Sequence, residues 1–339
     1  MKAYAGIDLH SSNNYVGIID ETDRRLYGRR HSNRLDEVLM ALEPYRDRLE
    51  GVVVESTYNW YWLVDGLQEH GYKVHLANPS AIQQYEGLKH TDDRWDSFWL
   101  AHMKRLNILP EGYIYPKQQR AIRDLLRRRL LFVRHRTAHI LSLQSMMNRH
   151  LGIKVSNNEI KKFEVKDVER MFESANVGFM ASSNILAIRF LSQIIKDIEK
   201  RVKSKIKLRK EFSMLLTIPG IGNILGLTIM LEVGDIGRFK TVGDYSSYSR
   251  CVGSTKFSDG KKKGENNKKN GNKYLAWAYI EAATFAIRYC PSAQRFYQRK
   301  KAKTNKIVAT KALSNKICRA SYYIMRDQVP FDEAKLFEN

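Results

Sequence analysis

Four acidic residues in the first hundred positions have spacings that could bring their carboxylates together. Asp8 follows the apolar run AYAGI, and Glu55 ends the run GVVVE. Asp93 and Asp96 are three residues apart in HTDDRWDSFWLAHM, which places two side chains on one face of a helix. Carboxylate oxygens suit Mg²⁺ or Mn²⁺, and two such ions about 4 Å apart stabilise the reacting oxygens of a phosphoryl transfer. The pattern predicts a divalent-metal site formed by an acidic tetrad: Asp8, Glu55, Asp93 and Asp96.

Each member of the acidic tetrad also has an ordinary structural explanation. An Asp after a strand is often a turn or cap residue, and Glu55 could be a strand end facing solvent. Asp93 and Asp96 could simply be stabilised by the dipole at the start of a helix. Asp92 offers an alternative spacing. Asp93 is preferred because it precedes Asp96 by three residues and because a small residue, Ser97, follows Asp96. The order Asp, Glu, Asp, Asp is more specific than any one member.

A second candidate site lies in residues 253–273, which we call the serine segment. It contains Ser254 and Ser258 among glycines, lysines and asparagines. Glycines let the backbone approach a phosphate, and lysines neutralise it. A serine could attack phosphorus there if a base or a metal activated it, and the segment holds no His. The residues alone favour a phosphate-binding loop and leave the two serines open. PGIG at 219–222 is typical of a hairpin that binds phosphate through backbone amides.

The elements that would position the acidic tetrad alternate between strands and helices. Short runs with high strand propensity occupy 3–8, 14–19, 51–55 and 73–78. Helical spacing of apolar residues occurs over 34–49 and 60–70, and again from about Arg94. This order predicts an α/β domain with a central mixed sheet.

The rest of the chain reads mostly as helix. Residues 117–150 predict one long basic helix and 183–210 a second, which could pack together as an antiparallel arm. A connector with short helices is expected between them, over 152–180. We expect the serine segment to be a loop, followed by helices at 274–289 and about 304–326.

The composition favours a nucleic-acid partner inside the cell. Among 339 residues, 58 Lys and Arg outnumber 36 Asp and Glu, and the net charge of +22 suits a polyanion. Cys251, Cys290 and Cys318 lack metal-ligand spacing, which favours a reducing compartment over a disulfide framework or zinc. No run approaches the roughly 18 apolar residues of a membrane span. We therefore expect a soluble, cytoplasmic protein without a targeting segment.

Two separated blocks resemble one known family. GIDLH, VVVEST and TDDRWDSFWLA resemble the signature of DEDD transposases of the Piv-like insertion-sequence group. IPGIG, GDIGRF and YSRCVGSTKFSDGKKKGENNKKNGNKYLAWAYIEAA resemble the second conserved block of that family. The resemblance spans most of the chain and is least distinctive over 150–205. It implies a RuvC-like (ribonuclease H-like) domain over 1–115. Together with the helical pattern, this gives three expected domains: the RuvC-like domain, a coiled-coil arm of long helices with a connector over 116–210, and a mostly helical transposase domain over 211–330.

The resemblance also implies roles for particular residues and partners. It assigns the acidic tetrad to Mg²⁺ or Mn²⁺, and it makes Ser258 the nucleophile that forms a covalent phosphoserine intermediate. Asp259 departs from the family pattern because it separates Ser258 from Gly260, so Ser254 stays a second candidate. Further implications are donor and target DNA, a structured non-coding guide RNA, and a homo-oligomer, dimer to tetramer. In that oligomer the acidic domain of one subunit would meet the serine domain of another, in the nucleoid of a bacterium.

Three other functions remain to be weighed. A junction-resolving metal nuclease would need the acidic tetrad but not Ser258. A non-catalytic nucleic-acid-binding protein would explain the charge but not the carboxylates. An actin-like ATPase is disfavoured, because VVVESTYNW lacks the glycines of a second phosphate loop.

Overall fold

The computed structural model describes residues 1–82, 93–205, 210–253, 255–265 and 270–337. Asp92 and Ser254, the two alternatives left open in the sequence, lie outside these residues. Contacts divide the chain into two compact units, one built on Met1–Lys117 and one on Gln118–Asn266 with Gly271–Asn339. Each unit has a hydrophobic core of its own.

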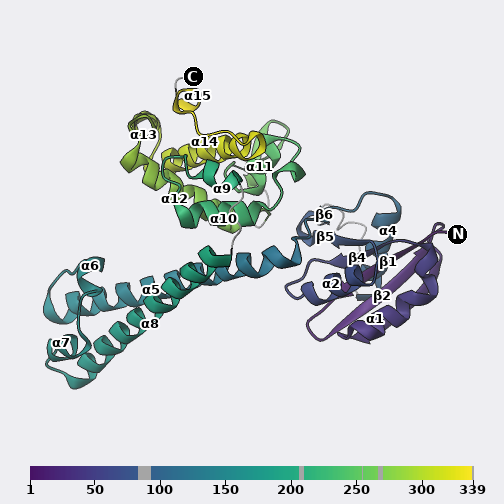
Figure 1. The fold of residues 1–339 in the computed structure, drawn as a ribbon, viewed down its shortest axis with the longest axis horizontal. Helices are drawn as coiled ribbons and strands as arrows, with labels where there is room; N and C mark the ends of the chain where they lie inside the picture. Colours follow the sequence, from purple (N-terminus) through teal and green to yellow (C-terminus); the bar gives the residue numbers. More distant parts are fainter. Residues whose placement is uncertain (83–92, 206–209, 254, 266–269, 338–339) are drawn as a thin grey trace. The chain divides into compact units, whose positions relative to one another are not determined.

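A six-stranded sheet forms the centre of the first unit (Figure 1). Its strands are β1 (Ala3–Leu9), β2 (Asn13–Asp20), β3 (Arg25–Ser32), β4 (Leu49–Glu55), β5 (Val74–Ala77) and β6 (Glu111–Gly112). They lie in the order β3-β2-β1-β4-β5-β6. Because β1 is antiparallel to β2 and parallel to β4, the sheet is mixed, as the sequence predicts. The pattern did not reveal β3, which is largely exposed, or β6, which is two residues long.

Helices cover both faces of this sheet. They are α1 (Leu35–Leu42), α2 (Tyr61–Glu69), α3 (Pro79–Ile82) and α4 (Asp93–Arg105), and a 3-10 helix runs over Glu43–Arg48. Val38 of α1 and Leu63 of α2 share a core with Ile7 of β1. On the opposite face, Leu100 of α4 packs with Val53 of β4. Successive strand residues face opposite sides of a sheet, so the unbroken apolar runs of β1 and β4 suit a sheet buried on both faces.

Three glycines, which we call the glycine row, lie side by side across the sheet beneath α4. Gly6 of β1 pairs with Gly17 of β2, and Gly17 pairs with Gly28 of β3. A Cβ on Gly6 would clash with the carbonyl oxygen of Ser97, and one on Gly17 would lie 2.6 Å from the Ser97 hydroxyl. A Cβ on Gly28 would lie 2.8 Å from the ring of Phe98. Bare backbone at these positions therefore lets α4 lie directly on the sheet.

Two long antiparallel helices, α5 (Lys117–Leu151) and α8 (Ala175–Lys205), begin the second unit (Figure 1). Arg129 of α5 donates to Glu199 of α8 at 2.7 Å, and His139 of α5 contacts Asn184 of α8 at 2.9 Å. The connector contains α6 (Asn157–Ile160) and α7 (Val165–Arg170). α8 begins at Ala175 rather than at residue 183, because the small and polar residues of its first turns hide the apolar periodicity.

The remaining helices of the second unit enclose its larger core. They are α9 (Lys210–Leu215), α10 (Asn223–Val233), α11 (Val242–Tyr248), α12 (Lys273–Tyr289), α13 (Pro291–Lys303), α14 (Lys306–Asp327) and α15 (Glu333–Phe337), with a 3-10 turn over Ile236–Arg238. In that core, the hydroxyl of Tyr279 on α12 hydrogen-bonds to those of Tyr245 on α11 and Ser321 on α14. The sequence did not reveal α13, whose residues are mostly polar and charged.

A two-stranded hairpin occupies part of the serine segment, which was expected to be a loop. Its strands are β7 (Thr255–Ser258) and β8 (Lys261–Glu265). Asp259 and Gly260 form the turn, with φ angles of 52° and 69°. Two consecutive positive φ angles are typical of the tight turn that joins hairpin strands, and Asp-Gly is a preferred sequence for it. The expectation of a loop is therefore wrong for this part of the segment.

One face of α8 is apolar and exposed. Phe179, Leu186 and Phe190 expose 67%, 56% and 66% of their surface, whereas Ile185 and Ile188 are buried. Within the described residues, α8 is the one helix long and apolar enough to cross a membrane, by length and composition only. This is weak evidence for a membrane span, because core helices of soluble proteins pass the same test.

Candidate active site

Asp8 and Glu55 lie at the same edge of the sheet. β1 and β4 are parallel neighbours, and their register pairs Ile7 with Val54. The next residue of each strand is therefore the carboxylate, Asp8 on β1 and Glu55 on β4. Asp8 is 1% exposed, and Glu55 is partly buried. The structure thus brings these two residues together at the carboxyl ends of neighbouring strands.

α4 brings the other two carboxylates toward Asp8. Asp93 and Asp96 lie in the first turn of α4, where the helix dipole favours negative charge. The glycine row holds this helix against β1 and β2. Burial raises the pKa of Asp8 to about 8, helped by hydrogen bonding to Glu55 and by the charges of Glu55, Asp96 and Asp93. All four members of the acidic tetrad therefore interact electrostatically around Asp8.

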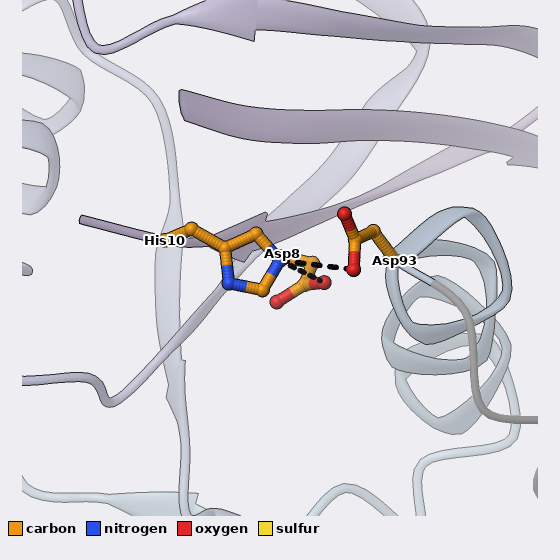
Figure 2. Close-up of side chains that lie close together, drawn as sticks. All are labelled: Asp8, His10 and Asp93. Atoms are coloured by element: carbon orange, nitrogen blue, oxygen red, sulfur yellow. Dashed lines mark ion pairs between the residues drawn. The ribbon is translucent and has the colours of Figure 1, made fainter. Parts of the chain in front are cut away.

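His10 also belongs to this edge, and the sequence reasoning missed it. Its Nε2 lies 3.2 Å from Asp8 Oδ2 and 3.1 Å from Asp93 Oδ1 (Figure 2). Arg30 of β3 contacts the other oxygen of Asp93, with 2.6 Å between Nη2 and Oδ2. The available signal was the spacing in GIDLH, because residues two apart along a strand point to the same face.

The donor atoms at this edge fit a divalent cation. One ligand atom each from Asp8, His10 and Asp93 lie within 4.8 Å of one another. Asp8 Oδ2 and His10 Nε2 are buried, yet neither makes a hydrogen bond of acceptable geometry in the described part of the chain. Buried polar atoms without hydrogen bonds are costly, and clustered carboxylates repel one another. A cation held between them would remove both costs.

Ser258 lies at the tip of the hairpin in the second unit. Its side chain is exposed, and it pairs with Lys261 across the ladder. Asp259, the residue that separates it from Gly260, is a turn residue. The departure from the family pattern therefore has a local structural role, since it completes a two-residue turn directly after the serine.

The PGIG segment connects α9 to α10. Gly220 has a φ of 89°, and a Cβ there would clash with the carbonyl oxygen of Ala282 on α12. Gly222 is the N-cap of α10 and supplies no capping side chain, and nothing lies within 4 Å of the position of its missing Cβ. The start of α10 is thus open at Gly222, an arrangement that could accept a phosphate.

A buried ion pair anchors the point where the serine segment returns to helix. Glu232 of α10, 1% exposed, accepts hydrogen bonds of 2.6 and 2.7 Å from Arg127 of α5. Asn272 donates to Glu232 at 2.7 Å, and its own side-chain oxygen caps α12 by accepting from the backbone of Tyr274 and Leu275. One carboxylate therefore ties α5, α10 and the start of α12 together.

Two family models match the chain, in the order expected. A model described as a transposase, of the DEDD and IS110 type, matches residues 5–151. A model described as the transposase IS116/IS110/IS902 family matches residues 213–298. The chain belongs to the IS110 family of transposases. A search of curated proteins found no match to this transposase.

The matched segments contain both candidate sites of the transposase. The acidic tetrad and His10 fall within the first match, and Ser258 falls within the second. The resemblance inferred from the sequence is confirmed. A transposase acts on DNA, which accounts for the net charge of +22. Use of a divalent metal agrees with the DEDD family and with the donor atoms around Asp8.

Proposed function

We propose that this transposase cuts and rejoins DNA strands of an insertion sequence, with a metal site at the acidic tetrad and Ser258 as the nucleophile. The observation that carries the proposal is the convergence of carboxylates on the buried Asp8, whose pKa is raised to about 8 first by burial and then by Glu55, Asp96 and Asp93. A purely DNA-binding protein has no need to bury such a group. The choice of Ser258 as nucleophile is supported by the family resemblance and by the exposed position of this residue at a hairpin tip.

The first unit supports the proposal of a RuvC-like domain over residues 1–115. Its sheet places three antiparallel strands beside two parallel ones, with Asp8 and Glu55 at the carboxyl ends of β1 and β4 and Asp93 and Asp96 on α4. We assign the long helices within 116–210 to a coiled-coil arm, and residues 211–330 to a transposase domain that carries Ser258. The antiparallel contacts between α5 and α8 support the assignment of the arm.

The acidic tetrad would hold Mg²⁺ or Mn²⁺. When bound, the ion would supply positive charge to the phosphate that reacts. Because burial and the neighbouring carboxylates raise the pKa of Asp8 to about 8, this residue would have to release a proton to act as a ligand near neutral pH. Arg30 keeps one oxygen of Asp93 engaged, which leaves the other oxygen directed toward Asp8 and His10.

Ser258 would hold one end of the cut DNA strand covalently until that end is rejoined. Its Oγ attacks the phosphorus, so that an Oγ–P bond forms and a bond from phosphorus to a deoxyribose oxygen breaks. The serine hydroxyl loses one proton, and the departing oxygen gains one. The phosphoserine is again a phosphodiester, so attack by the hydroxyl of another strand reverses the step and restores Ser258. No external energy source is needed, because the number of phosphodiester bonds is unchanged.

A structured non-coding guide RNA and a homo-oligomer, dimer to tetramer, belong to the same proposal. The net charge of +22 supports an RNA partner in addition to donor and target DNA. The exposed apolar stripe of Phe179, Leu186 and Phe190 supports contact with a second copy, since such stripes seldom stay exposed on a monomer. Nucleic acid copurified with the protein would be extracted and sequenced, and a discrete RNA is expected rather than random fragments.

Ser258→Ala tests the nucleophile. The protein with its copurified RNA and a metal would be incubated with labelled DNA carrying the ends of the element, then denatured and separated on a gel. Wild type is expected to give a covalent protein–DNA band, and Ser258→Ala none. Ser254→Ala is the matched control in the same segment and should keep the band. Circular dichroism would check that both variants fold.

The possible results separate the candidate functions. A band that persists in Ser258→Ala and disappears in Ser254→Ala would move the nucleophile to Ser254. Metal-dependent cleavage without any covalent band, in wild type as in the variants, would favour a junction-resolving nuclease. DNA binding without cleavage in any metal would leave a non-catalytic binding protein.

A further inference from the structure

His10 is placed where a ligand of the acidic site would lie. Its Nε2 is 3.2 Å from Asp8 Oδ2 and 3.1 Å from Asp93 Oδ1 (Figure 2). Adjacent ligand atoms around an octahedral ion, each about 2.1 Å from it, are separated by about 3.0 Å. The two distances therefore match two edges of one coordination octahedron that share the His10 nitrogen.

The backbone of His10 is held from several sides. Its carbonyl oxygen accepts hydrogen bonds from the side-chain amides of Asn33 at 2.9 Å and Asn59 at 3.0 Å, and its N–H donates to the carbonyl of Asn13. The hydroxyl of Thr57 donates to the side-chain oxygen of Asn59, which orients that amide. Supporting contacts of this kind fix a metal ligand before the ion arrives.

The nitrogen that faces the carboxylates is the buried end of the side chain. The His10 side chain as a whole is 42% exposed, yet Nε2 is buried and makes no hydrogen bond of acceptable geometry within the described residues. Asp8 Oδ2, which it faces, is also buried and also makes no hydrogen bond of acceptable geometry within the described residues. A histidine with only a surface role would turn this nitrogen toward water, whereas Nε2 of His10 faces the two carboxylate oxygens that a cation would also contact.

We propose that His10 is a nitrogen ligand of the cation at the acidic tetrad, and that it raises the preference of the site for Mn²⁺ over Mg²⁺. The proposal rests on the proposed function in one respect, namely that the tetrad binds a divalent cation. Mg²⁺ takes oxygen ligands and loses water reluctantly, whereas imidazole is a ligand of transition-metal ions. A site built from carboxylates alone would lack this preference.

Mn²⁺ is the probe that tests His10 without relying on activity. Pulsed electron paramagnetic resonance of Mn²⁺ bound to the full-length wild-type protein should show coupling to a ¹⁴N nucleus. His10→Asn should lose this coupling and weaken Mn²⁺ binding about tenfold or more, with a smaller effect on Mg²⁺. His135→Asn is the control, because that histidine is exposed on α5. His10→Gln and circular dichroism guard against a folding defect.

Each alternative result has a distinct meaning. If wild type binds Mn²⁺ but shows no ¹⁴N coupling, His10 is only a counter-charge for the two carboxylates, and the metal site survives without it. If ¹⁴N coupling persists in His10→Asn, the nitrogen comes from elsewhere and the proposal fails. If wild type binds no Mn²⁺ while Asp8→Asn behaves identically, both the ligand role and the proposed metal site are overturned.

Discussion

Asp8 is an acid that folding makes weaker. Its pKa rises from 3.8 to about 8, chiefly because it is buried and secondly because of Glu55 and the two aspartates of α4. In the unfolded chain the same carboxyl ionises near pH 4. Between these values the native state holds a proton that the unfolded state has released. Without metal, stability should therefore fall as the pH rises from about 4 to 8, and this contribution is lost above the folded pKa.

Asp8→Asn should remove that slope. In chelator, we expect the unfolding midpoint of wild type in urea to drop between pH 5 and pH 8.5, and that of Asp8→Asn to change less. The variant should also be the more stable protein at pH 8.5, because it buries no charge. Asp36→Asn is the control, since Asp36 is an exposed residue of α1 paired with Arg34. Parallel profiles for wild type and Asp8→Asn would contradict the assignment.

The sequence predicted that the four carboxylates of the acidic tetrad would converge, as they do around Asp8, but their role as metal ligands stays a prediction. Asp8 and Glu55 were predictable because carboxylates that end neighbouring strands share one edge of a sheet. His10 was missed because a single histidine after a strand is usually structural, although its spacing of two residues from Asp8 was the available signal. The choice of Ser258 over Ser254 depended on family resemblance, and it stays a prediction, since no chemical partner of Ser258 follows from residue types.

At the scale of elements, the position of α4 depends on the glycine row. Gly17→Ala would place a Cβ 2.6 Å from the Ser97 hydroxyl and 3.0 Å from the ring of Phe98. We expect a loss of about 1–3 kcal/mol in the free energy of unfolding, because the helix must move away from the sheet. Mn²⁺ affinity should fall as well, since α4 carries two members of the acidic tetrad.

Urea unfolding and Mn²⁺ titration would measure both effects of Gly17→Ala. Gly112→Ala in β6 is the matched control, because a Cβ there makes only ordinary contacts with Leu76, at 3.5 Å or more. Unchanged metal affinity in a destabilised Gly17→Ala protein would show that α4 reaches the site independently of the glycine row.

The ion pair between Arg127 and Glu232 links helices that are far apart in the sequence. Arg127→Leu would remove the charge-assisted hydrogen bonds that the buried Glu232 carboxylate accepts from Arg127. Breaking a buried pair in this way costs about 3 kcal/mol, so we expect the second unit to unfold at a clearly lower temperature. Arg128→Leu, one residue along on the exposed side of α5, should change little. Calorimetry of the two variants would test this, and equal melting temperatures would contradict it.

Elements with strong periodicity were predicted well, and the others were not. α5 begins at the predicted residue because apolar side chains recur at helical spacing throughout it. β3 and α13 were not predicted because both are polar over most of their length and so lack an apolar period. They are stabilised by neighbouring elements along the chain. The hairpin was not predicted because its strands are rich in lysine, which is uncommon in strands. The Asp-Gly pair at 259–260 was the available signal for its turn.

For the whole molecule, the exposed stripe on α8 bears on assembly. Phe190→Glu would place a charge among Phe179 and Leu186, the other members of the stripe. If a second copy covers this face, the variant should have a smaller mass than wild type in light scattering after size-exclusion chromatography. Met40→Glu is the control, because Met40 is an exposed residue of α1 outside the stripe. An unchanged mass for Phe190→Glu would place the subunit contact elsewhere.

The broad plan of the molecule was open to prediction, since a mixed α/β region precedes a mostly helical one. Alternating strands and helices with buried apolar runs specify the first, and long apolar periodicity specifies the second. Charge indicated a polyanionic partner but not which nucleic acid, because lysine and arginine contact any phosphate backbone. The guide RNA therefore stays a prediction.

The glycine row also affects how mutational tolerance should be interpreted in this transposase. Gly6, Gly17 and Gly28 carry no functional group, yet any side chain at these positions meets α4. A saturation screen scored by transposition alone would rank them with Asp8 and Asp93 as intolerant positions. A parallel screen for protein abundance would separate the two classes. Substitutions in the row should lower abundance and transposition together, whereas substitutions of the carboxylates should abolish transposition in a protein that still accumulates.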